Sequence, residues 1–161
     1  MTVPRRTVLV MLAMLAARPA FADATAFLGA NATPSNRLVR GVSAGIGLAI
    51  LGFEFEYAST SEDRNEGSPA LKTGMVNGLL QTPVAIFGFQ PYVTAGAGVY
   101  RETLDVTGHQ QTSLGLNMGG GLKISLIGPL RVRVDYRVFR LGSGALYSPA
   151  HRAYAGLNLK F

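Results

Sequence analysis

The chain of 161 residues contains no cysteine and no tryptophan. Without cysteine it can form no disulfide, no thiolate metal site, no cysteine nucleophile and no lipid anchor on an N-terminal cysteine. Small exported soluble domains commonly depend on disulfides, whereas a chain that folds within a bilayer has no such need. Long apolar runs are also missing after residue 22, where no segment reaches the roughly 18 consecutive apolar residues of a membrane-spanning helix. A helical membrane protein is therefore excluded.

The first 22 residues have the pattern of a cleaved signal peptide. Arg5 and Arg6 precede the apolar run Val8 to Ala17, and Ala20 to Ala22 form an A-x-A cleavage site, so the mature chain is predicted to begin at Asp23. A membrane anchor would need about 20 apolar residues. The two arginines also fit a twin-arginine signal, but the strongly apolar run favours the general secretory route. We expect a signal peptide over 1–22 and one domain over 23–161.

The excess of positive charge is small once the predicted signal peptide is set aside. Residues 23–161 hold 12 Lys and Arg against 9 Asp and Glu, a formal charge of +3 compared with +6 for the whole chain. The basic character of the chain therefore comes in part from its targeting segment, and a nucleic-acid partner loses most of its support.

The most informative stretch runs from Leu130 to Leu141. Its even positions are apolar up to Val138, and its odd positions from Arg131 to Arg137 are ionised. This period of two predicts a strand with one apolar and one charged face, because a helix would spread the arginines around its circumference. In a soluble sandwich the charged face would lie in water. In an outer-membrane barrel the apolar face would meet lipid and the charges would face the interior.

Strand patterns recur along the rest of the chain. The expected strands are Thr25 to Asn31, Leu38 to Ile50, Phe53 to Tyr57, Lys72 to Gln81, Tyr92 to Arg101, Ser113 to Ile124, Leu130 to Leu141 and His151 to Phe161. The phase of the first and fourth strands stays open, since Met75 and Val76 both fit the apolar side. A reversal at Leu51-Gly52 and the connections 82–88 and 126–129 are short, whereas 59–71, 102–111 and 142–150 are longer and polar.

Three features favour a membrane barrel over a soluble one. Most of the strands have about 10 residues, the length that crosses the hydrocarbon layer at a tilt of about 45°. Short and long connections alternate, as periplasmic turns and outer loops do. One face of the strands is continuously apolar, and the other collects Gly, Ser, Asn, Glu and Arg, the reverse of a soluble ligand-carrying barrel. The sequence thus predicts an all-β, eight-stranded, antiparallel, up-and-down transmembrane β-barrel.

The ending AYAGLNLKF is an alternating strand that finishes on an aromatic residue, Phe161. With PYVTAGAGVYR, GLNMGGGLKI and LRVRVDYRVF it resembles the small outer-membrane β-barrel family that includes the OmpA transmembrane domain and opacity-type proteins. The resemblance implies a monomer in the outer membrane of a Gram-negative bacterium, with Phe161 as the signal read by the barrel-assembly machinery. Because tryptophan is absent, an aromatic girdle would use Phe53, Phe55, Tyr57, Tyr92, Tyr100, Tyr136 and Phe161.

An eight-stranded barrel has an interior just wide enough to be filled by side chains. The inward phase predicts an ion-pair network there, because a buried charge without a partner costs several kcal/mol. Its expected members are Glu54, Glu56, Lys123, Arg131, Arg133, Asp135 and Arg137, with Arg152 and Lys160 on the same face. We expect Glu54 or Glu56 to meet Arg133 or Arg137. The network could plug the lumen or form an ion path through a switchable salt bridge.

Three arginines have the opposite, lipid-facing phase near the expected outer rim: Arg40, Arg101 and Arg140. Arginines that extend toward the headgroups at that depth could bind the phosphates of outer-leaflet lipopolysaccharide. Simple anchoring at the interface is the alternative.

The sequence does not predict a set of catalytic residues. Some barrels of this kind modify lipid A. A lipid A deacylase of this type resembles a hydrolase whose histidine base lies two residues from the nucleophilic serine on the same strand. Here His109 lies beside two glutamines, and the residue two positions after His151 is Ala153. No histidine pair or HExxH motif suggests a metal site, and no cofactor is expected. A structural or surface-interaction role is favoured; a lipid A modifying enzyme and a soluble periplasmic barrel are the alternatives.

Overall fold

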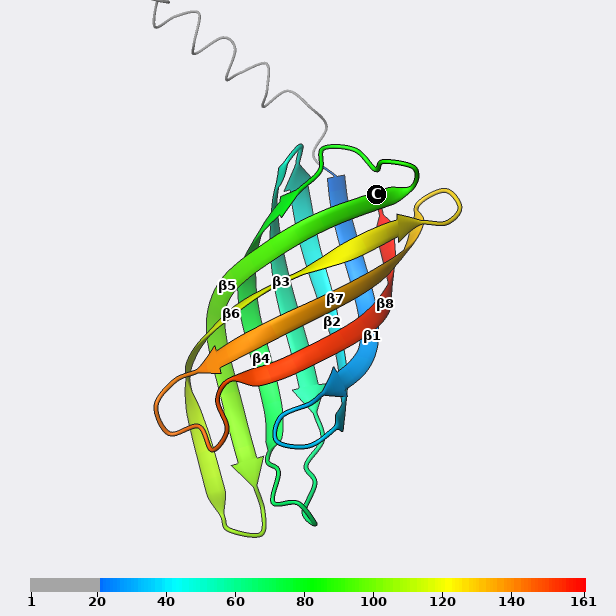
Figure 1. The fold of residues 1–161 in the computed structure, drawn as a ribbon. Helices are drawn as coiled ribbons and strands as arrows, with labels where there is room; N and C mark the ends of the chain where they lie inside the picture. The colour runs from blue at the N-terminus through cyan, green and yellow to red at the C-terminus, as the bar shows by residue number, and fades with distance from the viewer. Residues whose placement is uncertain (1–20) are drawn as a thin grey trace, which may run out of the picture.

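The computed structural model describes residues 21–161, which form one closed barrel of eight antiparallel strands (Figure 1). The strands are β1 (Phe21–Asn31), β2 (Arg37–Leu48), β3 (Leu51–Thr60), β4 (Ala70–Gln81), β5 (Phe89–Leu104), β6 (His109–Ser125), β7 (Leu130–Leu141) and β8 (Ala150–Lys160). Each strand pairs with its neighbours in the chain, and β8 closes the barrel on β1. The predicted all-β, eight-stranded up-and-down barrel is confirmed. In residues 21–161 no helix is long and apolar enough to cross a membrane.

The strand register is offset around the barrel. A row of directly opposite residues starts at Thr112 on β6, passes through Arg101, Lys72, Ser59 and Arg40, and continues across β1, β8 and β7. It returns to β6 at Leu122, ten residues along the strand from its starting point. In a barrel of eight strands this offset corresponds to a tilt of roughly 40° from the barrel axis and leaves no room for a wide channel.

The two ends of the barrel differ in their connections. The segments 32–36, 61–69, 105–108 and 142–149 lie at one end, which we call the loop end. The connections 49–50, 82–88 and 126–129 lie at the other, with the C-terminus beside them (Figure 1). We call this the terminus end.

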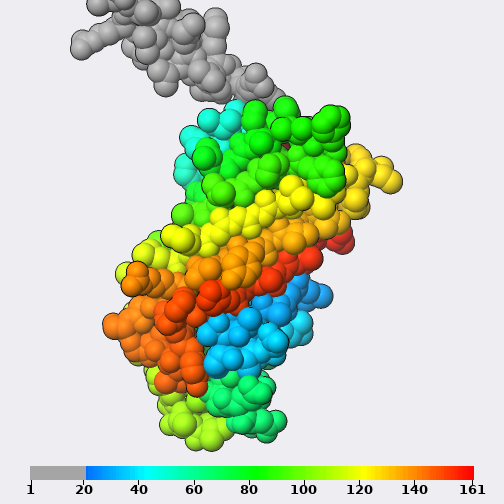
Figure 2. Space-filling model, in the orientation of Figure 1, coloured from blue at the N-terminus to red at the C-terminus, as the bar shows by residue number. Residues whose placement is uncertain are grey.

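Side chains alternate between the lumen and the exterior along the strands. On β3, Glu54 and Glu56 are buried in the lumen, whereas Phe53, Phe55 and Tyr57 are exposed outside. Every strand contributes large apolar side chains to the exterior, and the oblique strands form a continuous surface on the face shown in Figure 2. The exterior is therefore apolar where a soluble barrel would be polar.

The structure also gives the phase of the two ambiguous strands. On β4, Met75 is buried in the lumen and Val76 is exposed. On β1, Thr25 and Phe27 face inward and Leu28 faces outward.

Two of the aromatic residues expected in the girdle lie in the lumen instead. Tyr92 and Tyr100 are buried, whereas the other five expected members are exposed outside. Their phase on β5 is that of Thr94 and Glu102, so their rings fill the interior. The hydroxyl groups find partners there: Tyr100 donates to the Gly142 carbonyl at 3.1 Å, and Tyr92 contacts charged side chains described below. The expectation of a girdle position was wrong for these two residues.

Most strand boundaries differ by a few residues from the sequence-based expectation. The reversal between β2 and β3 is at Ala49 and Ile50, with Ala49 at φ 55°, rather than at Leu51-Gly52. This earlier turn places Glu54 opposite Gly45, within reach of the Ser43 hydroxyl at 3.0 Å. The segment 102–111, expected to be a loop, is mostly strand, because β5 continues to Leu104 and β6 begins at His109.

The predicted signal peptide lies outside the described residues, except for its last two positions. These two residues, Phe21 and Ala22, belong to β1, which begins four residues before the expected start at Thr25. Asp23, the predicted first residue of the mature chain, is also within this strand.

Candidate functional site

The centre of the lumen holds a network of paired charges. Glu54 accepts hydrogen bonds from Arg133 and, at 2.9 Å, from Arg137, both on β7. Asp135 lies between these arginines on the same strand and pairs with each at 3.0 Å. Glu56 pairs with Arg137 at 3.1 Å. Two adjacent inward positions of β3 thus face three of β7 across the barrel, so the pairs connect opposite walls.

Two tyrosine hydroxyl groups complete the hydrogen bonding of these carboxylates. Tyr92 donates to Asp135 and accepts a hydrogen bond from Nε of Arg133 at 2.6 Å. Tyr154 donates to Glu56 at 2.9 Å. A buried carboxylate is tolerated when both its charge and its lone pairs have partners, and these contacts meet that condition.

Toward the terminus end lies a second, smaller group of charges. Asp23 on β1 pairs with Lys123 at 2.6 Å and with Arg131 at 3.1 Å. Arg131 also donates to Asn158 at 2.7 Å and to Gln90 at 3.0 Å. A pocket of about 210 Å³ opens beside this group. The central network and this group together occupy the lumen from its middle to the terminus end.

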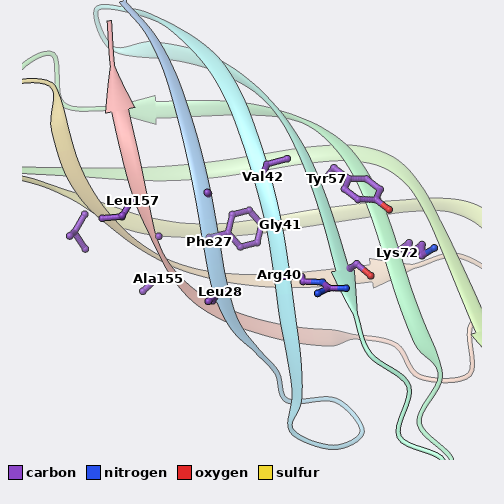
Figure 3. Close-up of a pocket in the computed structure, with 13 residues that line it drawn as sticks. Phe27, Leu28, Arg40, Gly41, Val42, Tyr57, Lys72, Ala155 and Leu157 are labelled. Atoms are coloured by element: carbon purple, nitrogen blue, oxygen red, sulfur yellow. The ribbon is translucent and has the colours of Figure 1, made fainter.

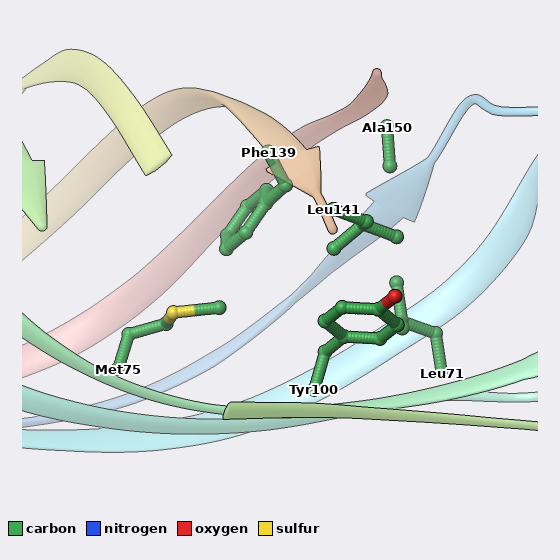
Figure 4. Packing of buried hydrophobic residues seen from close by; sticks show 6 residues of the cluster. All are labelled: Leu71, Met75, Tyr100, Phe139, Leu141 and Ala150. Atoms are coloured by element: carbon green, nitrogen blue, oxygen red, sulfur yellow. The ribbon is translucent and has the colours of Figure 1, made fainter. Parts of the chain in front are cut away.

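Toward the loop end the lumen contains a layer of apolar side chains, with buried polar side chains such as Arg37 and Glu102 beyond it. This apolar layer consists of Leu71, Met75, Tyr100, Phe139, Leu141 and Ala150, and Figure 4 shows its side chains converging from opposite walls. Arg152 joins the layer to the central network, because it pairs with Glu56 at 3.3 Å while its guanidinium lies 4.2 Å from the ring centroid of Phe139. The lumen is therefore packed at three successive levels.

The structure places all seven lumen residues named from the sequence inside the barrel, buried. It brings Glu54 to both Arg133 and Arg137, and Glu56 to Arg137. Lys160 is only partly buried, with Nζ 3.6 Å from the ring centroid of Phe21.

Sequence reasoning missed the tyrosine partners and Asp23. The two tyrosines share the inward phase of their strands, which was the available signal. Asp23 had no comparable signal, because β1 was expected to begin at Thr25.

Near the loop end four strands carry an outward-facing cation. On each, a buried apolar residue in the lumen is followed by a cation on the exterior. These pairs are Val39 and Arg40, Leu71 and Lys72, Tyr100 and Arg101, and Phe139 and Arg140. Cations with long aliphatic stems at this level suit the boundary between hydrocarbon and headgroups.

The outward cations are not equivalent in position. Arg40 and Lys72 are both directly opposite Ser59, and Arg101 is directly opposite Lys72. Arg140 lies on β7, opposite Leu116, and is not part of this row. Lys72 was not among the rim residues named from the sequence, because the phase of its strand was open.

The histidines do not form a recognisable catalytic set. His109 lies 3.9 Å from Glu102, and His151 contacts the Tyr136 hydroxyl at 2.7 Å. Within residues 21–161 no group of three His, Cys, Asp or Glu side chains is arranged to hold a metal ion.

Comparison with known proteins shows the fold of the chain. No protein-family model and no curated protein sequence matches it. The N-terminal β-barrel domain of Pseudomonas aeruginosa OprF is similar, with TM-score 0.67 and 19% identity over 88% of this chain and 97% of that domain. Neisserial surface protein A has TM-score 0.63 and 17% identity over 88% and 94% of the two chains. The outer-membrane enzyme PagL has TM-score 0.51 and 14% identity over 86% and 98%.

The chain therefore has the fold of the small eight-stranded outer-membrane β-barrels. Because the comparison includes an enzyme, the fold by itself does not decide whether the barrel is catalytic.

Proposed function

We propose that this protein is a monomeric integral barrel of a Gram-negative outer membrane, exported through the general secretory route, with a plugged lumen and a structural or surface-interaction role. The supporting observation is the distribution of polarity. Apolar side chains cover the exterior from every strand, while paired charges and an apolar layer fill the interior. A barrel in water would expose that exterior at a large cost in free energy. The loop end then faces the outside of the cell, and the terminus end faces the periplasm.

A lipid A modifying enzyme is the second candidate, and the fold it shares with PagL is what favours it. The local chemistry argues against a hydrolase here. His151 contacts Tyr136, and the neighbouring outward position is Ala153, which offers no nucleophile. The lumenal carboxylates are engaged by arginines and are buried away from lipid.

Membrane fractionation followed by gel electrophoresis with and without boiling tests the proposal. A closed barrel in the outer membrane resists detergent sample buffer, so the unboiled protein should migrate faster than the boiled protein. Treatment of the same membranes with alkaline carbonate should leave the protein in the pellet. A periplasmic protein without a mobility shift would contradict the proposal and would favour the soluble barrel.

A further inference from the structure

We propose that the exterior of β1, β2, β3, β4 and β8 near the loop end binds one molecule of a phosphorylated, multiply acylated glycolipid, the lipid A part of lipopolysaccharide. This inference rests on the proposed location in the outer membrane and names the partner of that surface. The site joins two cations, Arg40 and Lys72, to an apolar groove beside them (Figure 3). Ser59 lies between the two cations, and we call the three residues the basic cluster.

The groove is a hollow of about 940 Å³ on the lipid-facing wall. The outward side chains of Ala26 and Ala155 are small, and the larger Leu28, Val42 and Leu157 stand beside them. Because neighbouring strands pair Ala26 with both Val42 and Leu157, the hollow crosses the strands instead of following one of them. A hollow lined mainly by apolar side chains suits acyl chains.

The basic cluster lies at the loop-end side of the groove. The hydroxyl-bearing Ser59 is directly opposite Arg40 on one side and Lys72 on the other, and Lys72 is directly opposite Arg101. Like charges at directly opposite positions of a sheet repel one another. Among the described residues no carboxylate forms an ion pair with any of these three cations. A phosphate ligand would supply the missing negative charge.

The position of the cluster along the barrel axis matches a lipid headgroup. The interior residues next to Arg40 and Lys72 are the apolar Val39 and Leu71, and both cations project from the exterior at the loop-end side of the groove. Their long side chains can reach phosphate oxygens and donate charge-assisted hydrogen bonds. The groove extends from this level toward the middle of the apolar belt, the direction that the acyl chains of an outer-leaflet lipid take.

Arg101 and Arg140 have different roles in this arrangement. Arg101 extends the basic row, and its Nε lies 3.2 Å from the oxygen of the Gln110 side-chain amide when that oxygen faces it. Arg140 does not line the groove, and we assign it to interface anchoring. It therefore provides a matched control, because it is an outward cation at a similar level of the same barrel.

The test uses protein refolded in detergent, with the mobility shift on boiling verified first for every variant. Binding of diphosphoryl lipid A is measured by native mass spectrometry and by retention of fluorescent lipid on immobilised protein. The variants are Arg40→Gln with Lys72→Gln, Arg140→Gln, and Ala155→Leu, which fills the groove without changing charge. We expect the double variant to bind at least about tenfold more weakly, since it removes two charge-assisted hydrogen-bond donors to phosphate. Arg140→Gln should bind as the wild type does.

Other lipids distinguish the chemistry that is recognised. The wild type should bind monophosphoryl lipid A severalfold more weakly than diphosphoryl lipid A. The Ala155→Leu variant should bind diphosphoryl lipid A severalfold more weakly than the wild type does. Phosphatidylglycerol should compete poorly for the site. Equal competition by phosphatidylglycerol would show a general anionic-lipid surface and overturn the assignment. Equal loss in Arg140→Gln, or no binding by a wild type that shows the mobility shift, would also overturn it. Absence of the mobility shift in the wild type would instead contradict the proposed barrel function.

Discussion

At the scale of single residues, the charges of the lumen depend on one another. Glu54 accepts hydrogen bonds from Arg133, Arg137 and Ser43, and all four side chains are buried. Loss of one partner from a buried ion pair commonly costs about 3–5 kcal/mol, because the remaining charge stays desolvated. Removal of the Glu54 carboxylate would take a partner from two buried arginines, Arg133 and Arg137.

Glu54→Gln should therefore lower the free energy of unfolding by about 3 kcal/mol or more. The chain has no tryptophan, so urea unfolding in lipid vesicles is best followed by far-UV circular dichroism and by the mobility shift. Glu66→Gln, in the exposed loop 61–69, is the control and should change stability by less than about 0.5 kcal/mol. Equal stability of the two variants would show that the pairs add nothing.

The residue scale is also where the sequence was most informative. Alternation along Leu130 to Leu141 placed Arg133, Asp135 and Arg137 on one face, and every one of them is buried in the lumen. What alternation cannot give is the angular position of a strand around the barrel. Consequently the choice between Glu54 and Glu56 as partner of each arginine required the register, and Lys72 required the phase of β4.

At the scale of elements, strands longer than the membrane span change character along their length. The strong alternation of β7 ends at Phe139, where the inward residues become apolar and Arg140 faces outward. The polar composition of 102–111 suggested a loop, but β5 and β6 continue there as a paired hairpin. Beyond the hydrocarbon layer the outer face of a strand contacts water or headgroups, so the two-residue pattern that reveals strands is lost.

The last strand supports a prediction about assembly. Phe161 follows β8 at the terminus end and is 73% exposed. We propose that its ring is recognised when the barrel is inserted, so Phe161→Ala should lower the fraction of protein that shows the mobility shift in cells. Phe87→Ala removes an aromatic ring that is 96% exposed in the connection 82–88 at the same end, and serves as the control. Equal amounts of folded barrel for both variants would argue against this role.

At the scale of the whole molecule, three levels of packing close the lumen. The charges near Asp23, the central network around Glu54 and the apolar layer around Phe139 follow one another along the axis. Rearrangement of one salt bridge would leave the apolar layer in place. The third level was not expected from the sequence, because the interior was predicted from its charged positions alone.

Planar bilayers containing the purified barrel should therefore show no unitary current steps. Arg133→Gln should remain silent as well, because it leaves the apolar layer intact. A general porin in the same membranes serves as the positive control. Regular current steps in the wild type, or their appearance in Arg133→Gln alone, would favour an ion path over a plug.

The apolar layer at the loop end has one more consequence. The ion pairs of the central network are buried, so dissolved ions cannot approach them and screen them little. The apolar layer, in contrast, lies beneath the loops and is held by the exclusion of water, a force that weakens on cooling. The barrel thus combines two kinds of cohesion along one axis. The loop end of the lumen should therefore respond to temperature, whereas the central network should be insensitive to the salt concentration of the surroundings.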